Sequence, residues 1–475
     1  MMTERNMTMN TNVNMIVVGV VSIVTWMWYE KRQAKKQQQL QLLGDNDLLL
    51  LSSSDEEEKG CIYLDYNGTT PIEKSVVDAM MPYLTTHFGN PSSTHYYGYE
   101  PRMAIQQARQ HIATLIGAQN DDPNDCIIFT GCGTEADNMA IHMALSMTNT
   151  TTTTVTDKNE KPHIVTSAVE HPAILTYLQL LEKKGQVDVT YVKVNEEGLV
   201  SVVDVIDAIQ VDRTILVTIM YANNEVGSIQ PIQDIGLACH KLNILFHTDA
   251  AQAIGKVPPP SLQYVDMMTI VGHKLGAPKG IAALYIRSSI TTTTTTNSSS
   301  FLVGGGQEHG RRAGTENVPY IVAMGQAAKL LLTPTTKGDE PQWQYNVRHM
   351  KQMRQRLLQH FQQQQQQQQQ LLFKVNGPIH EEQRLPNTLS ISIKGLNSGK
   401  LVQTVGNLVA CSAGSACHAS DDTKAISPVL MAMNVPLDYA RGTLRLTIGP
   451  HTTPQQIDTA AQILIQEIKN QLSIP

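Results

Sequence analysis

Residues 270–281 read IVGHKLGAPKGI, and this stretch decides the fold prediction. It begins with the hydrophobic pattern of a buried strand and ends in a turn rich in glycine and proline, with Lys274 between the two. In open α/β sheets, functional groups gather at the carboxyl ends of the strands. We therefore predict that Lys274 lies at the end of a buried strand, in a position suited to chemistry.

Further strand-like runs alternate with helical segments along the chain. The runs cover residues 164–166, 189–192, 215–219 and 244–246, and a helical pattern at 232–242 separates the last two. Alternation of this kind is typical of a mainly parallel sheet with helices on both faces. The sequence therefore predicts an α/β fold.

A carboxylate upstream gives Lys274 a chemical meaning. A lysine that is partly neutral can attack the aldehyde of pyridoxal phosphate, and burial or a nearby cation lowers its pKa toward the working range. An acid beside the pyridine nitrogen keeps that nitrogen protonated, and Asp249 in the segment 246–252 is the candidate. A strand-terminal lysine alone is more often solvated; together, Lys274 and Asp249 indicate pyridoxal phosphate.

The cofactor phosphate needs a cradle of its own. Residues 127–130 read as a short buried strand, 131–135 as a glycine turn with Gly133 and Thr134, and 136–142 as an amphipathic helix. Glycines let the backbone approach an anion, and the N–H groups at a helix start bind phosphate. The alternative is an ordinary strand-to-helix turn with Thr134 as N-cap. With Lys274 present, we favour the phosphate site.

A run of small residues carries the candidate nucleophile. Residues 410–420 read ACSAGSACHAS and precede a polar stretch, which predicts an exposed loop around Cys417. An exposed cysteine in polar surroundings can act as a thiolate, whereas a cysteine in an apolar run is usually inert. By this rule Cys411 and the four cysteines before it in the chain are packing residues. The sequence has no CxxC pair, so it predicts neither a zinc site nor a disulfide framework.

Taken in order, these segments resemble the cysteine desulfurases and selenocysteine lyases of the aminotransferase class V superfamily. The matching motifs cover roughly residues 60–470 and lie at 64–71, 88–93, 130–138, 167–171, 222–227, 247–252, 272–280, 304–317, 385–388 and 412–417. The resemblance implies the fold type I of pyridoxal phosphate enzymes. This fold has a large domain with a mainly parallel seven-stranded sheet and a smaller C-terminal α/β domain, which we place at residues 60–335 and 336–475.

The resemblance also implies roles for the residues around the cofactor ring. Lys274 would bind the cofactor and move the substrate Cα proton, Asp249 would hold the pyridine nitrogen, and Gln252 would contact the ring hydroxyl. His171 would stack on the ring and assist proton transfer, and Asn223 would approach the cofactor. A histidine before a proline is otherwise a common helix-start residue, so the role of His171 rests on the family match.

Substrate and phosphate contacts follow from the same resemblance. Arg445 would clamp the substrate carboxylate in the bidentate way that arginine favours, although a strand-edge surface arginine is the alternative, and Asn90 would also contact the substrate. Thr134, His273 and, across a subunit boundary, Thr315 would bind the phosphate beside Gly133. The contribution of Thr315 implies a homodimer.

The predicted reaction removes sulfur or selenium from L-cysteine or L-selenocysteine and yields L-alanine. Sulfur would pass to Cys417 as a persulfide and then to an acceptor protein, whereas selenide is a better leaving group and depends less on Cys417. Desulfurases commonly have a serine where this chain has Val271, so one phosphate hydrogen bond would be missing. Because selenocysteine lyases resemble the chain at Val271 and at 315–319, 384–388 and 427–430, we favour a selenocysteine lyase.

Length and charge agree with an enzyme. The 475 residues suffice for two domains with substantial cores. The net charge of −6, with no basic cluster interleaved with aromatic residues, argues against a nucleic-acid partner. Three low-complexity tracts, at 149–154, 291–300 and 362–370, read as loop expansions, or for the glutamines of the third tract as a helix extension.

The N-terminus predicts a membrane anchor. After a tail at 1–12, residues 13–29 are mostly apolar and end in aromatic residues, and a basic flank extends to residue 36. The positive-inside rule then places the enzyme body in the cytosol, tethered through a linker at 37–59. A wrongly chosen start codon and a disordered apolar tail are the alternatives.

Two other functions remain open. A class V aminotransferase would need Lys274 but no cysteine loop. A catalytically inactive, membrane-tethered scaffold for sulfur-transfer partners would need neither, and the presence of Lys274, Asp249, Gln252, His171 and Arg445 argues against it.

Overall fold

The computed structural model describes residues 60–148, 160–291, 300–336, 338–367, 371–414 and 426–473. It separates into two units, residues 1–61 and 62–475, and the fold below is that of the second unit. The predicted tail, anchor and linker lie outside the described residues and stay predictions. Within the ranges given, no helix has the length and apolar character needed to span a membrane.

A seven-stranded sheet forms the centre of this unit. Its spatial order is β2 (Ile127–Thr130), β8 (Ala282–Ile286), β7 (Met267–Val271), β6 (Leu245–Asp249), β5 (Thr214–Thr218), β3 (His163–Ser167) and β4 (Asp188–Val192). β8 runs antiparallel to both of its neighbours, and the other pairs are parallel. The predicted mainly parallel seven-stranded sheet is confirmed.

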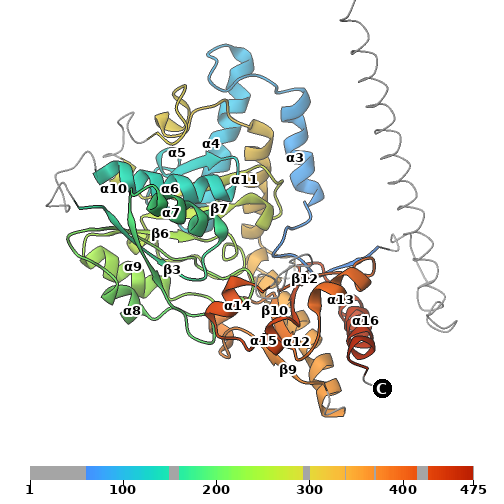
Figure 1. The fold of residues 1–475 in the computed structure, drawn as a ribbon. Coiled ribbons are helices and arrows are strands. Elements are labelled where there is room, and N and C mark those ends of the chain that lie inside the picture. Colours follow the sequence, from blue (N-terminus) through green and yellow to red (C-terminus); the bar gives the residue numbers. More distant parts are fainter. Residues whose placement is uncertain are drawn as a thin grey trace, which may run out of the picture. The chain divides into compact units, whose positions relative to one another are not determined.

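Helices cover both faces of this sheet because its central strands are apolar on both sides. All residues of β3, β5, β7 and β8 are buried, as expected for a sheet packed on two faces. Successive residues of β8 enter different cores. Leu284 packs with residues of α6 (Gly133–Thr148) and α7 (Pro172–Lys183), and Tyr285 packs with residues of α4 (Tyr96–Ile116), α9 (Ile232–Lys241) and α11 (Val318–Leu332). Figure 1 shows these helices around the labelled strands β3, β6 and β7.

Shorter elements complete this part of the chain. They are α3 (Lys74–Thr85), α5 (Pro123–Cys126), α8 (Val202–Asp207), α10 (Ser288–Thr291) and the 3-10 turns Leu262–Tyr264, Gly272–Lys274 and Gln307–Gly310.

A second core surrounds a four-stranded antiparallel sheet. Its order is β12 (Ser412–Ala413), β13 (Thr443–Thr447), β10 (Thr388–Ile393) and β9 (Phe373–Val375). The helices that accompany it are α12 (Gln342–Gln367), α13 (Ser398–Val405), α14 (Pro428–Ala432), α15 (Leu437–Ala440) and α16 (Pro454–Leu472), with a 3-10 turn at Glu381–Gln383. Apolar residues of α12, α13 and α16 pack on its strands (Figure 1).

The start of the second unit joins this smaller core. β1 (Ile62–Tyr63) pairs in parallel with β11 (Val409–Ala410), and Leu64 is buried among the residues of the second core. The predicted boundary at 335/336 falls between α11 and α12, and the division into domains stays a prediction. Gln362–Gln367 continue α12, as the helix-extension interpretation expects, while the other two tracts lie mostly outside the described residues.

The contact between α11 and α4 depends on a glycine. A Cβ atom added to Gly325 would come within 2.6 Å of the Cα and Cβ atoms of Ala108. We expect Gly325→Ala to lower the free energy of unfolding by about 1–3 kcal/mol because neither helix backbone can yield easily. Urea denaturation measures this. Gly306→Ala is the control, since a Cβ there meets nothing within 4 Å; equal stability of the two variants would contradict the close packing.

Candidate active site

Lys274 directly follows β7, as predicted. It ends the 3-10 turn Gly272–Lys274, and this turn is held by hydrogen bonds from Gly272 N to Ile281 O (3.1 Å) and from Ala277 N to Gly272 O (3.1 Å). A side chain at Gly272 would collide with Ile281 at 2.8 Å. The turn therefore requires glycine at that position and fixes the direction in which Lys274 leaves the sheet.

The amine of Lys274 is held by two backbone carbonyls. Nζ donates to Gly68 O at 2.7 Å and also to Asn67 O. Burial and then the positive charge of Arg445 lower the pKa of Lys274 to about 8. A substantial fraction of this amine is therefore neutral just above neutral pH, the state that attacks a carbonyl carbon.

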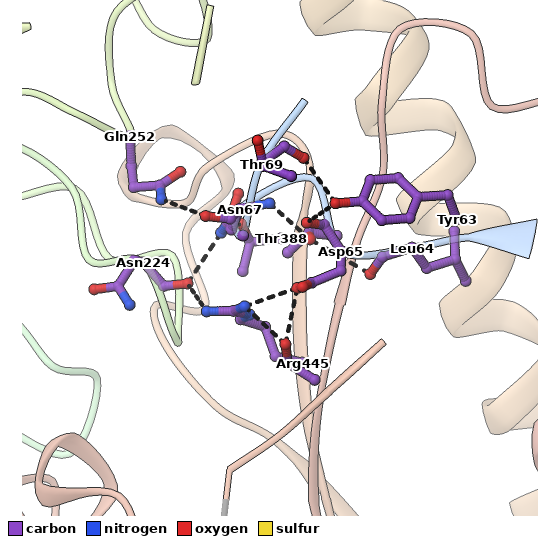
Figure 2. A network of polar contacts seen from close by, with 12 residues as sticks. Tyr63, Leu64, Asp65, Asn67, Thr69, Asn224, Gln252, Thr388 and Arg445 are labelled. Carbon is purple, nitrogen blue, oxygen red and sulfur yellow. Dashed lines mark hydrogen bonds and ion pairs between the residues drawn. The ribbon is translucent and has the colours of Figure 1, made fainter. Parts of the chain in front are cut away.

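Asn67 lies shortly after β1, and its hydrogen bonds connect the start of the second unit to both sheets (Figure 2). Its side chain donates to Asn224 O (3.0 Å) and Thr388 Oγ1 (2.9 Å) and accepts from Asn387 Nδ2 (3.0 Å), and its carbonyl also accepts from Gln252 Nε2 (3.0 Å). The side chain is 1% exposed. Sequence reasoning placed Asn67 in a motif without a role. The Asn67-Gly68 pair signals a turn, but partners 157 and 321 residues away leave no local pattern.

Asp249 ends β6 and is almost fully buried. Its Oδ1 accepts a hydrogen bond from Ala251 N at 2.9 Å. Burial raises the pKa of this carboxyl, although the hydrogen bond and the charges of His171 and Lys274 act in the opposite direction. Asp249 is thus a buried acid whose ionised form needs a nearby cation.

Two more carboxyl groups lie buried near Asp249. Asp137 of α6 has a pKa raised well above its usual value, first by burial and then by the charge of Asp249. Its Oδ1 has no hydrogen-bond partner among the described residues, and its nearest basic group is His247 Nε2 at 3.9 Å. Burial also raises the pKa of Glu170 to about 8. Among the described residues, no cation is hydrogen-bonded to these carboxyl groups, and the protonated ring nitrogen of pyridoxal phosphate would supply one; the residues present fit that cofactor.

The predicted phosphate cradle lies at the start of α6. A Cβ atom at Gly133 would come 2.6 Å from Val271 Cγ2, so only glycine lets this helix end approach the end of β7. Thr134 is exposed in the first helical turn. His273 Nδ1 lies 3.1 Å from Thr69 Oγ1, and burial followed by the charge of Lys274 lowers the pKa of His273 to about 4. Its imidazole is therefore neutral at pH 7.

Arg445 of β13 points to the same region and is already engaged (Figure 2). Nη2 donates to Asp65 Oδ1 (2.7 Å) and Ser412 Oγ (2.9 Å), and Nη1 donates to Asn224 O (3.3 Å). The buried Nε finds no partner among the residues that the structure describes. Asp65, which sequence reasoning did not select, thus limits the donors of Arg445 that remain for a second carboxylate.

Asn223 and His171 shape neighbouring loops. The fully buried Asn223 accepts from Glu225 N (2.9 Å) and Val226 N (3.0 Å) and donates to Val169 O (3.1 Å), so its side chain is used within its own turn and with the 169 loop. His171 is the N-cap of α7, where its Nδ1 accepts from Ala173 N (3.2 Å). The helix-start interpretation of His171 therefore holds, and its exposed ring lies near enough to influence the Asp249 carboxyl.

The remaining predicted residues lie apart from this group. Asn90 is exposed and accepts from Ser92 N (2.9 Å), and Thr315 is exposed before α11. No hydrogen bond within the described ranges joins either residue to Lys274 or Asp249. Cys417 lies outside the described residues, and Cys411 is buried.

Comparison with known proteins gives a consistent result. The aminotransferase class-V family model matches residues 62–459. The chain is 40% identical over 410 residues to a cysteine desulfurase of Nostoc sp., covering 85% of this chain and 92% of that one. It is 37% identical over 405 residues to the cysteine desulfurase IscS of Dictyoglomus turgidum, covering 85% and 93%.

Two solved structures resemble the fold. A NifS-like protein superposes with a TM-score of 0.72 at 29% identity, covering 87% of this chain and all of that one (100%). The structure of SspA in complex with cysteine gives a TM-score of 0.64 at 32% identity, covering 82% and 99%.

Asn67 offers a test of the site's architecture. Asn67→Ala removes three side-chain hydrogen bonds and leaves buried partners unsatisfied. We expect the free energy of unfolding to fall by about 2–4 kcal/mol, since each such loss costs roughly 1–3 kcal/mol and losses at one site overlap. Urea denaturation measures the change, with the exposed Asn470→Ala as control. A loss of stability no larger than that of the control would show that the hydrogen bonds of the Asn67 side chain do not hold the site together.

Proposed function

We propose that this chain, which belongs to the aminotransferase class V family and within it to the cysteine desulfurases, removes sulfur from L-cysteine or selenium from L-selenocysteine and releases L-alanine. The observation that carries the proposal is the Lys274 amine, whose pKa is lowered to about 8 and which lies close enough to the buried acid Asp249 for each charge to act on the pKa of the other. The extent of the family match supports it, because it covers both sheets.

Pyridoxal phosphate is the cofactor of this family, and it stores the electrons released when a bond at the substrate Cα breaks. We assign its binding to residues at the ends of β6 and β7 and at the start of α6. Asp249 would hold the ring nitrogen and Gln252 the ring hydroxyl, while Gly133, Thr134 and His273 would hold the phosphate. The neutral His273 would donate one hydrogen bond without adding charge.

Lys274 would have two tasks. Its neutral amine attaches the cofactor, and the same nitrogen then takes and returns the proton at the substrate Cα. Because its pKa is about 8, the neutral fraction increases as the pH rises through 8 and is small below pH 7. The carbonyls of Asn67 and Gly68 hold the amine in place between these events.

Arg445 and its neighbours would bind the substrate carboxylate. Asp65 occupies one side of the guanidinium, so the substrate meets the Nε side, where a buried donor has no partner among the described residues. Asn90 would add a contact from the exposed segment before α4, and His171 would stack on the cofactor ring.

The described residues on either side of the segment 415–425 support sulfur transfer to Cys417. Before the loop, Gly414 N donates to Thr443 O (2.8 Å); after it, Ser427 N donates to Gly414 O (3.0 Å). Both ends are thus fixed beside β13, the strand of Arg445. The Cys417 thiolate would attack the substrate sulfur, forming a sulfur–sulfur bond as the carbon–sulfur bond breaks. The electron pair of the broken carbon–sulfur bond stays with the three-carbon fragment, which takes up a proton and leaves as L-alanine.

The choice between sulfur and selenium rests on different observations. The relatives above are named cysteine desulfurases, which favours cysteine. Val271 and the motifs at 315–319, 384–388 and 427–430 favour selenocysteine. Either product would pass to an acceptor protein in the cytosol, where residues 13–29 would tether the enzyme to a membrane.

Alanine release tests the reaction. The full-length protein is assayed with L-cysteine and with L-selenocysteine, beside Lys274→Ala and Cys417→Ala. We expect both activities to disappear in Lys274→Ala, and Cys417→Ala to abolish the cysteine reaction while sparing selenocysteine. A strong preference for selenocysteine would identify a dedicated lyase.

Other outcomes of this assay would point elsewhere. No alanine from either substrate, with the cofactor bound, would leave the class V aminotransferase as the better hypothesis. Failure of the purified protein to bind pyridoxal phosphate would favour the inactive scaffold.

An exposed aromatic surface supports a homodimer. It consists of Phe88, Tyr96, Tyr97 and Tyr99, whose exposed fractions range from 54% to 85%. Phe88 and Tyr97 stack with ring centroids 5.5 Å apart. So many exposed aromatic rings in one segment are typical of an interface. We propose that a second copy covers this surface and brings its own Thr315 to the phosphate.

Charge inserted into the aromatic surface should separate the subunits. The double variant Phe88→Asp/Tyr96→Asp is expected to be monomeric by light scattering, because two desolvated carboxylates oppose association. Ile379→Asp is the matched control, since Ile379 is 84% exposed and lies far along the chain. A dimeric double variant would show that this surface is not the interface.

A further inference from the structure

We propose that Lys256 is a positioning residue that fixes the orientation of the Gln252 amide and so determines which of its atoms faces the cofactor. This inference rests on the proposed function, because it concerns how Gln252 meets the ring hydroxyl of pyridoxal phosphate. Neither the sequence motifs nor the family match assigned Lys256 a role.

Lys256 lies one turn after Gln252 in the segment that follows β6. Its backbone N–H donates to Ala253 O (2.9 Å), and the residue is only 6% exposed. Its Nζ donates to Gln252 Oε1 at 2.9 Å. The lysine and the glutamine are therefore joined by a short, buried hydrogen bond within one turn of chain.

The bond has a direction that only one amide orientation satisfies. An ammonium group donates hydrogen bonds and cannot accept them, whereas the two ends of a glutamine amide differ in this respect. While Lys256 is protonated, Oε1 must face it, so Nε2 faces the site, where it donates to Asn67 O at 3.0 Å. When the amide instead contacts the ring hydroxyl, the lysine keeps Nε2 as the atom that is presented.

The same chain of contacts reaches Lys274. Asn67 O accepts from both Gln252 Nε2 and Lys274 Nζ, so two lysines are linked through one amide and one carbonyl. Both lysines also line a cavity of about 350 Å³ whose walls are mostly apolar. Lys256 is therefore connected to the Lys274 amine through Gln252 and Asn67, and it would act on the cofactor through Gln252.

Structural stability alone does not explain a cation at this place. Within the described chain, no carboxylate lies within ion-pair distance of Lys256. Burial and then the charge of Lys274 lower the pKa of Lys256 to about 7, so keeping the proton is costly. An apolar side chain of similar length is often as stable or more stable at such a site. Because stability does not account for this buried ammonium, and its side chain donates to the Gln252 amide, we assign it the task of orienting that amide.

A double-mutant cycle tests the link. Apoprotein of the full chain is titrated with pyridoxal phosphate by fluorescence, for wild type, Lys256→Met, Gln252→Ala and the double variant. We expect each single variant to bind about fivefold more weakly, since a hydrogen bond of this kind is worth roughly 1 kcal/mol. The double variant should bind no more weakly than Gln252→Ala, because Lys256 acts through Gln252.

A merely structural lysine would behave differently. Lys256→Gln keeps a donor toward Oε1 and should restore affinity to within about twofold of wild type. Thermal unfolding of Lys256→Met should be unchanged or raised, which separates a binding defect from a folding defect.

Each contrary result has a defined meaning. Two results would overturn this inference and leave the proposed function intact. One is a double variant whose loss of affinity for pyridoxal phosphate equals the product of the two single losses. The other is a Lys256→Met variant that binds pyridoxal phosphate as tightly as wild type does. Wild-type protein that binds no pyridoxal phosphate would overturn the proposed function and this inference together.

Discussion

The convergence of donors on the carbonyl oxygen of Asn67 is the constraint on which the site depends. This oxygen accepts from Lys274 and Gln252, while the side chain of the same residue joins loops of the large sheet to a strand of the small one. An asparagine that is buried with all these partners cannot move without leaving several polar groups unsatisfied. The relative position of the reactive amine and the two sheets is therefore set by one short N-terminal segment, whose backbone also meets β11 and β13.

Charge is divided between two sides of the site. Asp249, Asp137 and Glu170 form a buried acidic side, and burial raises the pKa of each. Lys274 and Lys256 form a basic side, where burial lowers the pKa of each, and Arg445 adds its own charge there. On both sides burial favours the neutral form of each group, because an unmatched charge is costly at low dielectric. A ring with a protonated nitrogen and an anionic oxygen has the dipole that matches this division.

Patterns within a short stretch of sequence predict the features that depend on neighbouring residues, such as strands, turns and helix starts. The buried strands and the glycine turn after β7 follow from apolar runs and from Gly272, and so Lys274 was found at the correct place. The need of a pyridine nitrogen for an acid indicated Asp249, and the family resemblance supplied Gln252. The pairing of Asp65 with Arg445, 380 residues away, and the unpartnered oxygen of Asp137 arise only when distant segments pack together. His171 shows the reverse: the sequence indicated a helix start, and the N-cap geometry agrees with it.

Val271 shows how a departure from the family pattern fits into the packing. A serine at this place would offer the phosphate a hydroxyl, and the valine offers a methyl group that contacts the start of α6. That contact leaves no room for a side chain at Gly133, so glycine lets the start of α6 lie against the end of β7. In the proposed cofactor site, the phosphate would lack the hydroxyl of a serine and would depend more on the backbone at the start of α6 and on Thr134.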